Sequence, residues 1–334
     1  GYNRFAHEAP PVWAAFASLQ DWQMLTPHSN TVKLYYQPFQ PNAFDAAESL
    51  SGVMNSLFCA FGWQRGDIRS AKHAVSFHVP EKVLNSPDYT GAIGGGYNAL
   101  FLLTKIGSDY RNPANPAATL QVEPEHFSAA RSMGMWVKLN EENRRNLEIL
   151  RQQVANLRRA GVLPAGNRTD VDSGLFESET GEIRTDVRNH TLTVDAPKFQ
   201  AAVVKGSGAV KLSALSASTP CTIAAISLEN EKPVADSGRL LVVIGTMFAA
   251  ENAVFSTENF DAELDVGDMQ QLMRAGRFDF SLKTSRKGTP KVYALNLNGS
   301  RERELPVELQ NGALHFAWDT STLEYGTPYF EVVY

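Results

Sequence analysis

Hydrophobic residues recur at helical spacing in the first half of the chain and alternate at strand spacing in the second half. In residues 9–20 (APPVWAAFASLQ), Val12, Phe16 and Leu19 fall on one stripe, and the two prolines fit a first helical turn. The spacing therefore predicts a helix over residues 9–20.

Two further segments predict helices. Residues 44–61 (FDAAESLSGVMNSLFCAF) give an apolar helix that is expected to end near Gly62. Residues 140–160 give the clearest pattern, with Asn140 as the cap, acidic residues in the first turn and arginines in the last. The charges along this last helix indicate a solvated face.

The segments between these helices predict strands and turns. Residues 21–25, 32–36 and 74–79 are expected to be short strands. Residues 91–104, which contain GAIGGGYNALFLL, predict a glycine-rich turn followed by a helix or a strand. Residues 108–120 predict a loop because Asn and Pro recur in them.

After residue 170 the segments become short, alternating and separated by turn signals such as Asn298-Gly299 and Asn311-Gly312. The strand-like segments are GEIRTDV, HTLTVDA, QAAVVKG, CTIAAISL, GRLLVVIGTMF, FDFSLKT, KVYALNLNG, ELPVELQNG, ALHFAW and YFEVVY. This pattern is typical of an antiparallel β-sandwich. The predicted fold class is α/β followed by all-β, with a mixed domain over residues 1–169 and a β-sandwich over residues 170–334.

Composition narrows the classes of partner. Hydrophobic residues make up 43% of the chain and the net charge is -5 without a basic block, so nucleic acid is not an expected partner. No apolar run approaches the roughly 20 residues of a membrane helix, so no membrane partner is expected. Cys59 and Cys221 are expected to be buried free thiols. Since His and Cys show no metal-ligand spacing, neither a metal nor a cofactor is predicted.

Five longer stretches, in this order along the chain, carry a resemblance to a known group of enzymes. They are NRFAHEAPPVWAAFASLQDW, QRGDIRSAKHAV, ESETGEIRTDVRNHTLTVDAPKFQAAV, ISLENEKPVADSGRLLVVIGTMFAAEN and KVYALNLNGSRERELPVE. They resemble bacterial glycoside hydrolases of clan A, the β-galactosidase-, agarase- and endoglucanase-like enzymes. The first stretch resembles the segment after the seventh strand of their (β/α)8 barrel. The second resembles the stretch after the last barrel helix, and the others resemble hairpins of the C-terminal β-domain.

The resemblance implies the last part of a (β/α)8 TIM barrel plus a C-terminal antiparallel β-sandwich. In such enzymes the catalytic glutamates come from barrel strands four and seven, which would precede Gly1. A whole barrel needs about 250 residues, so it does not fit into the part before residue 170. The missing barrel portion is therefore the expected partner of this chain. Self-association through exposed strand edges stays open.

The implied activity is retaining hydrolysis of a β-linked polysaccharide or oligosaccharide, such as a β-galactoside, galactan, agar or β-glucan. The two catalytic carboxyl groups are expected upstream of Gly1, and secretion or export to the periplasm is favoured. The chain departs from the family pattern at Gln23, where an acidic residue is usual, and in MLTPHSN, which replaces a more aromatic strand eight.

Six residues near the start of the chain are candidates for substrate binding. Trp22 is a candidate stacking platform for a sugar ring, and the alternative is a core Trp behind the barrel. His28 and Ser29 end the expected strand eight and would point into the site, whereas the alternative for His28 is a structural loop residue.

The remaining candidates are Glu8, Arg4 and Asn3, which would line the same rim. Glu8 is either a sugar ligand or a carboxylate that stabilises the start of the following helix, and the structural role is favoured.

Two other motifs resemble known functional motifs, but we expect a structural role for both. Arg65 and Asp67 in the RGD triplet are expected to form an intradomain ion pair. GAIGGGYN lacks the Gly-x-Gly-x-x-Gly spacing of a dinucleotide site and is expected to be a flexible turn.

Two further hypotheses stand beside the hydrolase. The chain is alternatively a non-catalytic carbohydrate-binding or scaffolding module. Trp318 is the only Trp after residue 170, which weakens a sugar-binding role for the sandwich. A structural role for the sandwich, which would cover the flank of the barrel, is compatible with the hydrolase.

Overall fold

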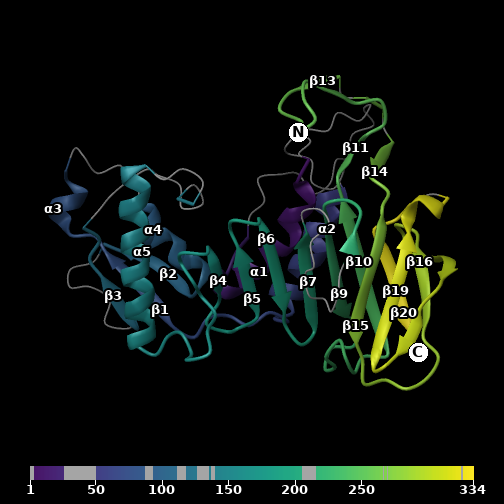
Figure 1. Cartoon of the computed structure of the whole chain (residues 1–334), viewed down its shortest axis with the longest axis horizontal. Coiled ribbons are helices and arrows are strands. Elements are labelled where there is room, and N and C mark those ends of the chain that lie inside the picture. The colour runs from purple at the N-terminus through teal and green to yellow at the C-terminus, as the bar shows by residue number, and fades with distance from the viewer. Residues whose placement is uncertain are drawn as a thin grey trace. The chain divides into compact units, whose positions relative to one another are not determined.

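The computed structural model describes residues 4–25, 50–86, 93–110, 118–125, 135–136, 140–204, 216–265, 267–268, 270–324 and 326–334. The chain is mostly β, with a smaller α/β part (Figure 1). It forms two compact units. The first comprises Gly1–Ala15, Met24–Ile68 and Thr191–Tyr334, and the second comprises Phe16–Gln23 and Arg69–His190. The predicted domain boundary near residue 170 stays a prediction.

The first predicted helix is confirmed. A short 3-10 turn, η1 (Ala6–Glu8), leads directly into α1 (Ala9–Leu19). The predicted strand over residues 21–25 is wrong, because the chain turns there. Asp21 has φ 57°, its N–H bonds to the Ser18 carbonyl, and the Trp22 N–H bonds to the Ala17 carbonyl at 3.0 Å. This pair of bonds is the Schellman pattern that ends a helix and satisfies its last carbonyls.

The second predicted helix is confirmed in its described part. It comprises α2 (Leu50–Phe58) and a π-helical continuation, η3 (Cys59–Gln64). The helix thus passes Gly62, where its end was predicted. A Cβ at Gly62 would lie 3.0 Å from Ile68 Cδ1 and 3.1 Å from Ala14 Cβ, so this glycine permits close packing instead of ending the helix. The strand predicted over residues 32–36 lies outside the described residues.

Two antiparallel sheets form most of the first unit, and every strand-like segment predicted after residue 170 contains a strand. Within the first unit, the strand order of the larger sheet is β17 (Arg301–Leu305), β16 (Lys291–Leu295), β20 (Tyr329–Val333), β10 (Arg239–Thr246), β9 (Cys221–Ser227), β7 (Phe199–Val204) and β6 (Thr191–Asp195). The smaller sheet orders β18 (Glu308–Gln310), β19 (Ala313–Asp319), β15 (Arg277–Lys283) and β8 (Ser216–Ala217). Between β18 and β19, Asn311 and Gly312 both have positive φ, as the predicted tight turn requires.

The two sheets share one hydrophobic core. The smaller sheet contributes Phe278, Phe280, Phe316 and Trp318, all at most 4% exposed. The Trp318 ring lies 4.6 Å from that of Phe330 on β20, and its indole N–H donates to the Pro306 carbonyl at 2.9 Å. The buried polar atom of this large side chain is therefore satisfied.

The opposite face of the larger sheet is covered by the helices near the start of the chain. Phe58 packs edge-on against Phe199 with ring centroids 5.3 Å apart. Met54 fills the space above Gly245, and a Cβ at that glycine would overlap the Met54 side chain. Since both faces of this sheet are buried, β9 (CTIAAIS) and β10 (RLLVVIGT) are almost continuously apolar.

A buried carboxylate fixes the end of the helical segment on this sheet. Asp67 has a fully buried side chain and accepts hydrogen bonds from Arg65 Nε at 2.9 and 3.0 Å, and Lys198 Nζ lies 3.1 Å from its Oδ1. Arg65 also donates to the Ser227 carbonyl at 2.7 Å. The predicted ion pair between Arg65 and Asp67 is confirmed, and it connects the helix end to β7 and β9.

The second unit contains a parallel sheet with the order β2 (Lys105–Asp109), β1 (Ala74–His78) and β3 (Leu120–Val122). Its helical segments are α3 (Glu81–Leu84), α4 (Gly95–Asn98), η4 (Ala99–Leu102) and α5 (Glu141–Arg159). The predicted strand over residues 74–79 and the helix over 140–160 are confirmed, and Asn140 caps α5 by accepting from the Asn143 N–H at 2.8 Å. The predicted loop over 108–120 is wrong at both ends, which belong to β2 and β3.

A hairpin of β4 (Leu175–Glu177) and β5 (Ile183–Asp186) places three buried carboxylates against backbone N–H groups. Glu177 accepts from the Arg168 N–H at 2.7 Å, and Glu182 accepts from the Arg69 N–H at 2.8 Å. Glu179 accepts from the His73 N–H at 3.2 Å and from the Thr104 hydroxyl at 2.7 Å. The three acidic residues of ESETGE thus each bind a different segment of this unit to the hairpin.

Removal of the Asp67 charge tests the ionic contact of the first unit. We expect Asp67→Asn to lower the free energy of unfolding by about 3 kcal/mol, because Arg65 and Lys198 would lose their shared partner. Urea denaturation checks this. Asp195→Asn at the exposed end of β6 is the control and should change stability by less than about 0.5 kcal/mol. Equal effects of the two substitutions would contradict the assignment.

Glu331 generates a pH-dependent prediction. Its buried carboxylate accepts from Arg239 Nε at 2.5 Å and from Arg301 Nε at 2.7 Å. Burial alone would raise the pKa of Glu331, but the two arginines outweigh it and hold the pKa below its ordinary value. A depressed pKa contributes stability above the unfolded-state pKa of about 4.3, and this contribution is lost as the pH falls through the folded-state value.

We therefore expect Glu331→Gln to be less stable than the parent protein at about pH 7, with a gap that narrows below about pH 4. Urea denaturation across this pH range measures the gap. Glu304→Gln on exposed β17 serves as the control. A gap that does not change with pH would show that the arginine contacts do not act through the charge.

Candidate functional site

Three of the six predicted binding residues are described, namely Arg4, Glu8 and Trp22. Asn3, His28 and Ser29 lie outside the described residues, and the predictions made for them stay predictions.

Arg4 lies against a distant part of the sequence. Its Nη1 donates to Asn259 Oδ1 at 3.1 Å and lies 3.7 Å from Glu258 Oε1. Asn259 and Glu258 belong to the turn between two short strands, β12 (Val254–Phe255) and β13 (Glu263–Asp265). Arg4, one of the predicted binding residues, thus contacts side chains from the second half of the sequence.

Glu8 ends η1 and immediately precedes α1. A carboxylate at this position interacts favourably with the exposed N–H groups of a helix start, which agrees with the structural alternative. Trp22 belongs to the second unit and follows α1 in the turn described above. Its side chain is 42% exposed, so solvent reaches it, whereas a core Trp would be buried.

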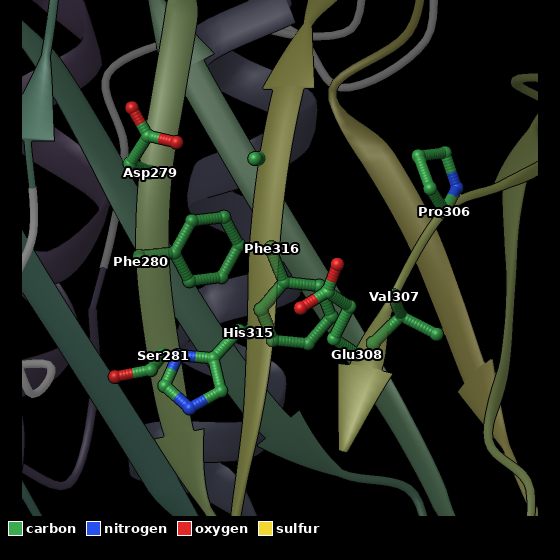
Figure 2. Close-up of a pocket in the computed structure, with 9 residues that line it drawn as sticks. Asp279, Phe280, Ser281, Pro306, Val307, Glu308, His315 and Phe316 are labelled. Carbon is green, nitrogen blue, oxygen red and sulfur yellow. The ribbon is translucent and has the colours of Figure 1, made fainter. Parts of the chain in front are cut away.

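A groove on the outer face of the smaller sheet is a second candidate (Figure 2). Inward-facing Phe280 and Phe316 form its floor, and the outward-facing side chains of β15, β19 and β18 line it. These outward residues are Asp279, Ser281, Glu308, His315 and Ala317. The hollow has a volume of about 310 Å³, and an adjoining hollow of about 570 Å³ shares Ser281 and His315 with it.

Strand register places three of these residues in one row across the sheet. Ser281 pairs with His315, and His315 pairs with Glu308. Figure 2 shows the Ser281 and His315 side chains next to one another, with Asp279 further along β15. The groove therefore displays imidazole and carboxylate groups along an open surface, whereas the Ser281 side chain is almost buried.

The two carboxylates of the groove come from strands that are not neighbours. Asp279 is on β15 and Glu308 is on β18, with β19 between these strands. From strand spacing and rise, their Cα atoms lie about 12 Å apart. Both residues are also exposed, so the groove is better suited to binding than to catalysis.

Sequence reasoning missed the groove, although a signal for it exists. In FDFSLK and ALHFAW, aromatic residues alternate with Asp279, Ser281 and His315. Period-two alternation places these polar residues on one sheet face. What the sequence alone did not provide was the pairing of β15 with β19, which brings the two polar sets together.

Cys59 and Cys221 are buried free thiols, as predicted. Burial raises the pKa of Cys59 to about 11 and that of Cys221 to about 12. Such thiols are poor nucleophiles and poor metal ligands at neutral pH. Within the described part of the chain, no cluster of three or more His, Cys, Asp or Glu side chains is arranged to hold a metal ion.

Comparisons with known proteins identify no relative. No family model, no curated protein and no solved structure matches this chain. In the part that the structure describes, no helix has both the length and the apolar character needed to cross a membrane.

The glycine-rich stretch has a packing role that replaces the predicted flexible turn. Gly95 and Gly96 begin α4, and a Cβ at Gly96 would overlap the Asn146 carbonyl oxygen of α5 and lie 3.0 Å from Ile149 Cβ. The Gly96 N–H donates to Asn146 Oδ1 at 3.1 Å. The glycine is needed because the two helices approach closely.

We expect Gly96→Ala to destabilise the protein by about 2 kcal/mol through steric overlap between α4 and α5. Gly107→Ala is the matched control, because a Cβ at Gly107 meets no atom within 4 Å. Thermal and urea unfolding followed by circular dichroism measure the difference. A Gly96→Ala protein as stable as the control would disprove the packing role.

Proposed function

We propose that this chain is the C-terminal part of a clan A glycoside hydrolase that cleaves a β-linked polysaccharide or oligosaccharide. In this proposal the strand-rich part is an accessory β-sandwich that holds the last helices of a (β/α)8 barrel. The observation that carries the proposal is the packing of η1 and α2 on the larger sheet. These helices belong to the region that resembles the end of the barrel.

The contacts support a role in holding the helices. Phe58 packs on Phe199, and the Thr222 hydroxyl donates to the His7 carbonyl at 2.5 Å. The buried Asp67 joins the end of the helical segment to β7 and β9 through Arg65 and Lys198. A helix that presents an apolar stripe must bury it, and the larger sheet supplies the matching apolar face.

The chemistry of such an enzyme requires two carboxyl groups on either side of the scissile bond, one as nucleophile and one as acid and base. We place this pair upstream of Gly1, on strands four and seven of the barrel. Arg4 and Glu8 would then lie just after strand seven, at the face of the barrel where substrates bind. Asn3, Trp22, His28 and Ser29 complete the proposed set of sugar-binding residues.

The outer groove favours a second candidate, a non-catalytic carbohydrate-binding module. Exposed carboxylate and imidazole groups suit the hydroxyls of a sugar chain, and the groove is open along β15 and β19. Against this candidate, the aromatic rings Phe280 and Phe316 are almost fully buried and cannot stack on a sugar.

The test is hydrolysis by the polypeptide that carries this chain together with its barrel. We expect release of aryl leaving groups from β-galactosides or β-glucosides, or of reducing ends from galactan, agar or β-glucan, with retention of anomeric configuration. Nuclear magnetic resonance of the first product gives the stereochemistry.

Glu308→Ala in the outer groove is the control and should leave turnover unchanged. Sugar binding without turnover of any of these substrates, abolished by Glu308→Ala, would favour the binding module instead.

A further inference from the structure

An arm of the first unit extends from β10 and β15 beyond the ends of the two sheets (Figure 1). It comprises Phe248–Met273 and is built from two strand pairs. At its base β11 (Phe248–Ala250) pairs with β14 (Gln271–Met273), and near its tip β12 pairs with β13. The sequence resemblance assigns no role to this arm.

The arm carries a stacked aromatic pair next to its tip. The rings of Phe255 and Phe260 are nearly parallel, at 17°, with centroids 3.9 Å apart, and both side chains are half-buried. Phe260 has φ 64°, a left-handed conformation that is rare for a bulky residue. Such a conformation persists only where the surroundings enforce it, so the ring of Phe260 is held in place at an energetic cost.

Hydrogen bonds within the tip enforce this geometry. The Thr257 hydroxyl donates to Asp261 Oδ2 at 2.7 Å, and the Phe260 N–H donates to the Thr257 carbonyl at 3.1 Å. The tip therefore holds its partly buried aromatic pair in a defined arrangement, and the side chains of Glu258 and Asn259 next to it are exposed.

The base and the tip of the arm both contact the start of the chain. Ala6 and Leu50 pack against the small apolar cluster of Phe248 and Ala250, and so do Phe255 and Phe260 of the arm itself, which leaves each aromatic ring only partly accessible. At the tip, Arg4 donates to Asn259 and lies 3.7 Å from Glu258. The arm thus contacts the start of the chain at Arg4 and Ala6.

We propose that the arm is a substrate-binding element that holds a neutral β-linked polysaccharide chain through Phe255 and Phe260, some distance from the bond that is cleaved. This inference rests on the proposed hydrolase function, because that function places the rim of Arg4 and Glu8 at the mouth of the active site.

The side chains of the arm define the chemical class of the polymer. Half-buried aromatic rings suit the apolar faces of pyranose rings, and Asn259, Glu258 and Arg4 can bond to hydroxyl groups. The arm contains six acidic residues and no Lys, Arg or His. They are Glu251, Glu258, Asp261, Glu263, Asp265 and Asp268. This density of negative charge repels sulfated or uronic-acid polymers, so a neutral glucan or galactan fits.

A hollow of about 390 Å³ lies at the base of the arm and is large enough to hold a further part of such a polysaccharide chain. Arm residues Gln270, Gln271 and Leu272 line it, together with Thr320 and Ser321. These amide and hydroxyl groups can bind further sugar hydroxyls without adding charge.

Phe260→Ala and Phe255→Ala in the polypeptide that carries the barrel test the proposal. Affinity electrophoresis in gels with a neutral β-galactan or β-glucan, and in gels with a sulfated polymer of the same backbone, measures binding independently of hydrolysis. We expect each variant to bind the neutral polymer about tenfold more weakly than the parent protein. Phe260→Tyr, which retains the ring, and Leu264→Ala, which removes an exposed side chain of β13, should bind normally.

If the unfolding curves of the alanine variants match that of the parent protein, the loss of polymer binding is local and not a loss of folding. Unchanged affinity in both alanine variants, or equal affinity of the parent for the sulfated polymer, overturns the proposal. A dimer in light scattering that dissociates in Phe260→Ala would assign the arm to self-association and would also overturn it.

Turnover of a short aryl glycoside separates this inference from the proposed function. A short substrate makes fewer contacts with the arm than a polymer does, so the alanine variants should lose much less kcat/KM on it than the about tenfold that they lose on the polymer. If the parent protein cleaves neither substrate, the hydrolase proposal fails, and the binding measurement still decides whether the arm holds a neutral polymer.

Discussion

The larger sheet of the first unit is apolar on both faces, and this constraint organises the rest of that unit. Strands such as β9 and β10 would be insoluble with either face open to water. One face is covered by the smaller sheet through Phe278, Phe280 and Trp318, and the other is covered by η1 and α2. Segments from opposite ends of the sequence must therefore fold together, because neither can bury its apolar surface alone.

Buried charges then define where the covering elements sit. Apolar contacts such as those of Met54 and Phe58 are tolerant of small displacements, whereas a buried carboxylate must meet its donors within hydrogen-bond distance. Asp67 fixes the helical segment in the first unit, and Glu177, Glu179 and Glu182 do the same for the hairpin of the second. In both units the acidic residues determine the alignment of elements that the hydrophobic effect brings together.

Local sequence patterns predicted most elements but not their partners. Helical spacing identified α1 and α5, and alternation identified the strands after residue 170, because these signals depend on neighbouring residues. The strand predicted over residues 21–25 was wrong because the Schellman bonds of Asp21 and Trp22 are a backbone property that apolar composition conceals. A helix was expected to end near Gly62, and Gly96 was expected to lie in a flexible turn. Each glycine instead permits a close approach between elements, which only the tertiary structure reveals. The contact of Arg4 with Asn259 joins two distant parts of the sequence, and no local pattern could have predicted it.

The positions of the two thiols give the protein an internal probe of local opening. Cys221 lies in the core between the sheets, whereas Cys59 lies in the helical segment that covers the other side of the larger sheet. Both are buried and protonated at neutral pH, so an alkylating reagent can reach either one only when its layer separates. The chain has no other cysteine, so the two labelling rates would be measured separately. The rate of Cys221 would report how often the smaller sheet separates from the larger sheet, and that of Cys59 how often the helical segment separates from it.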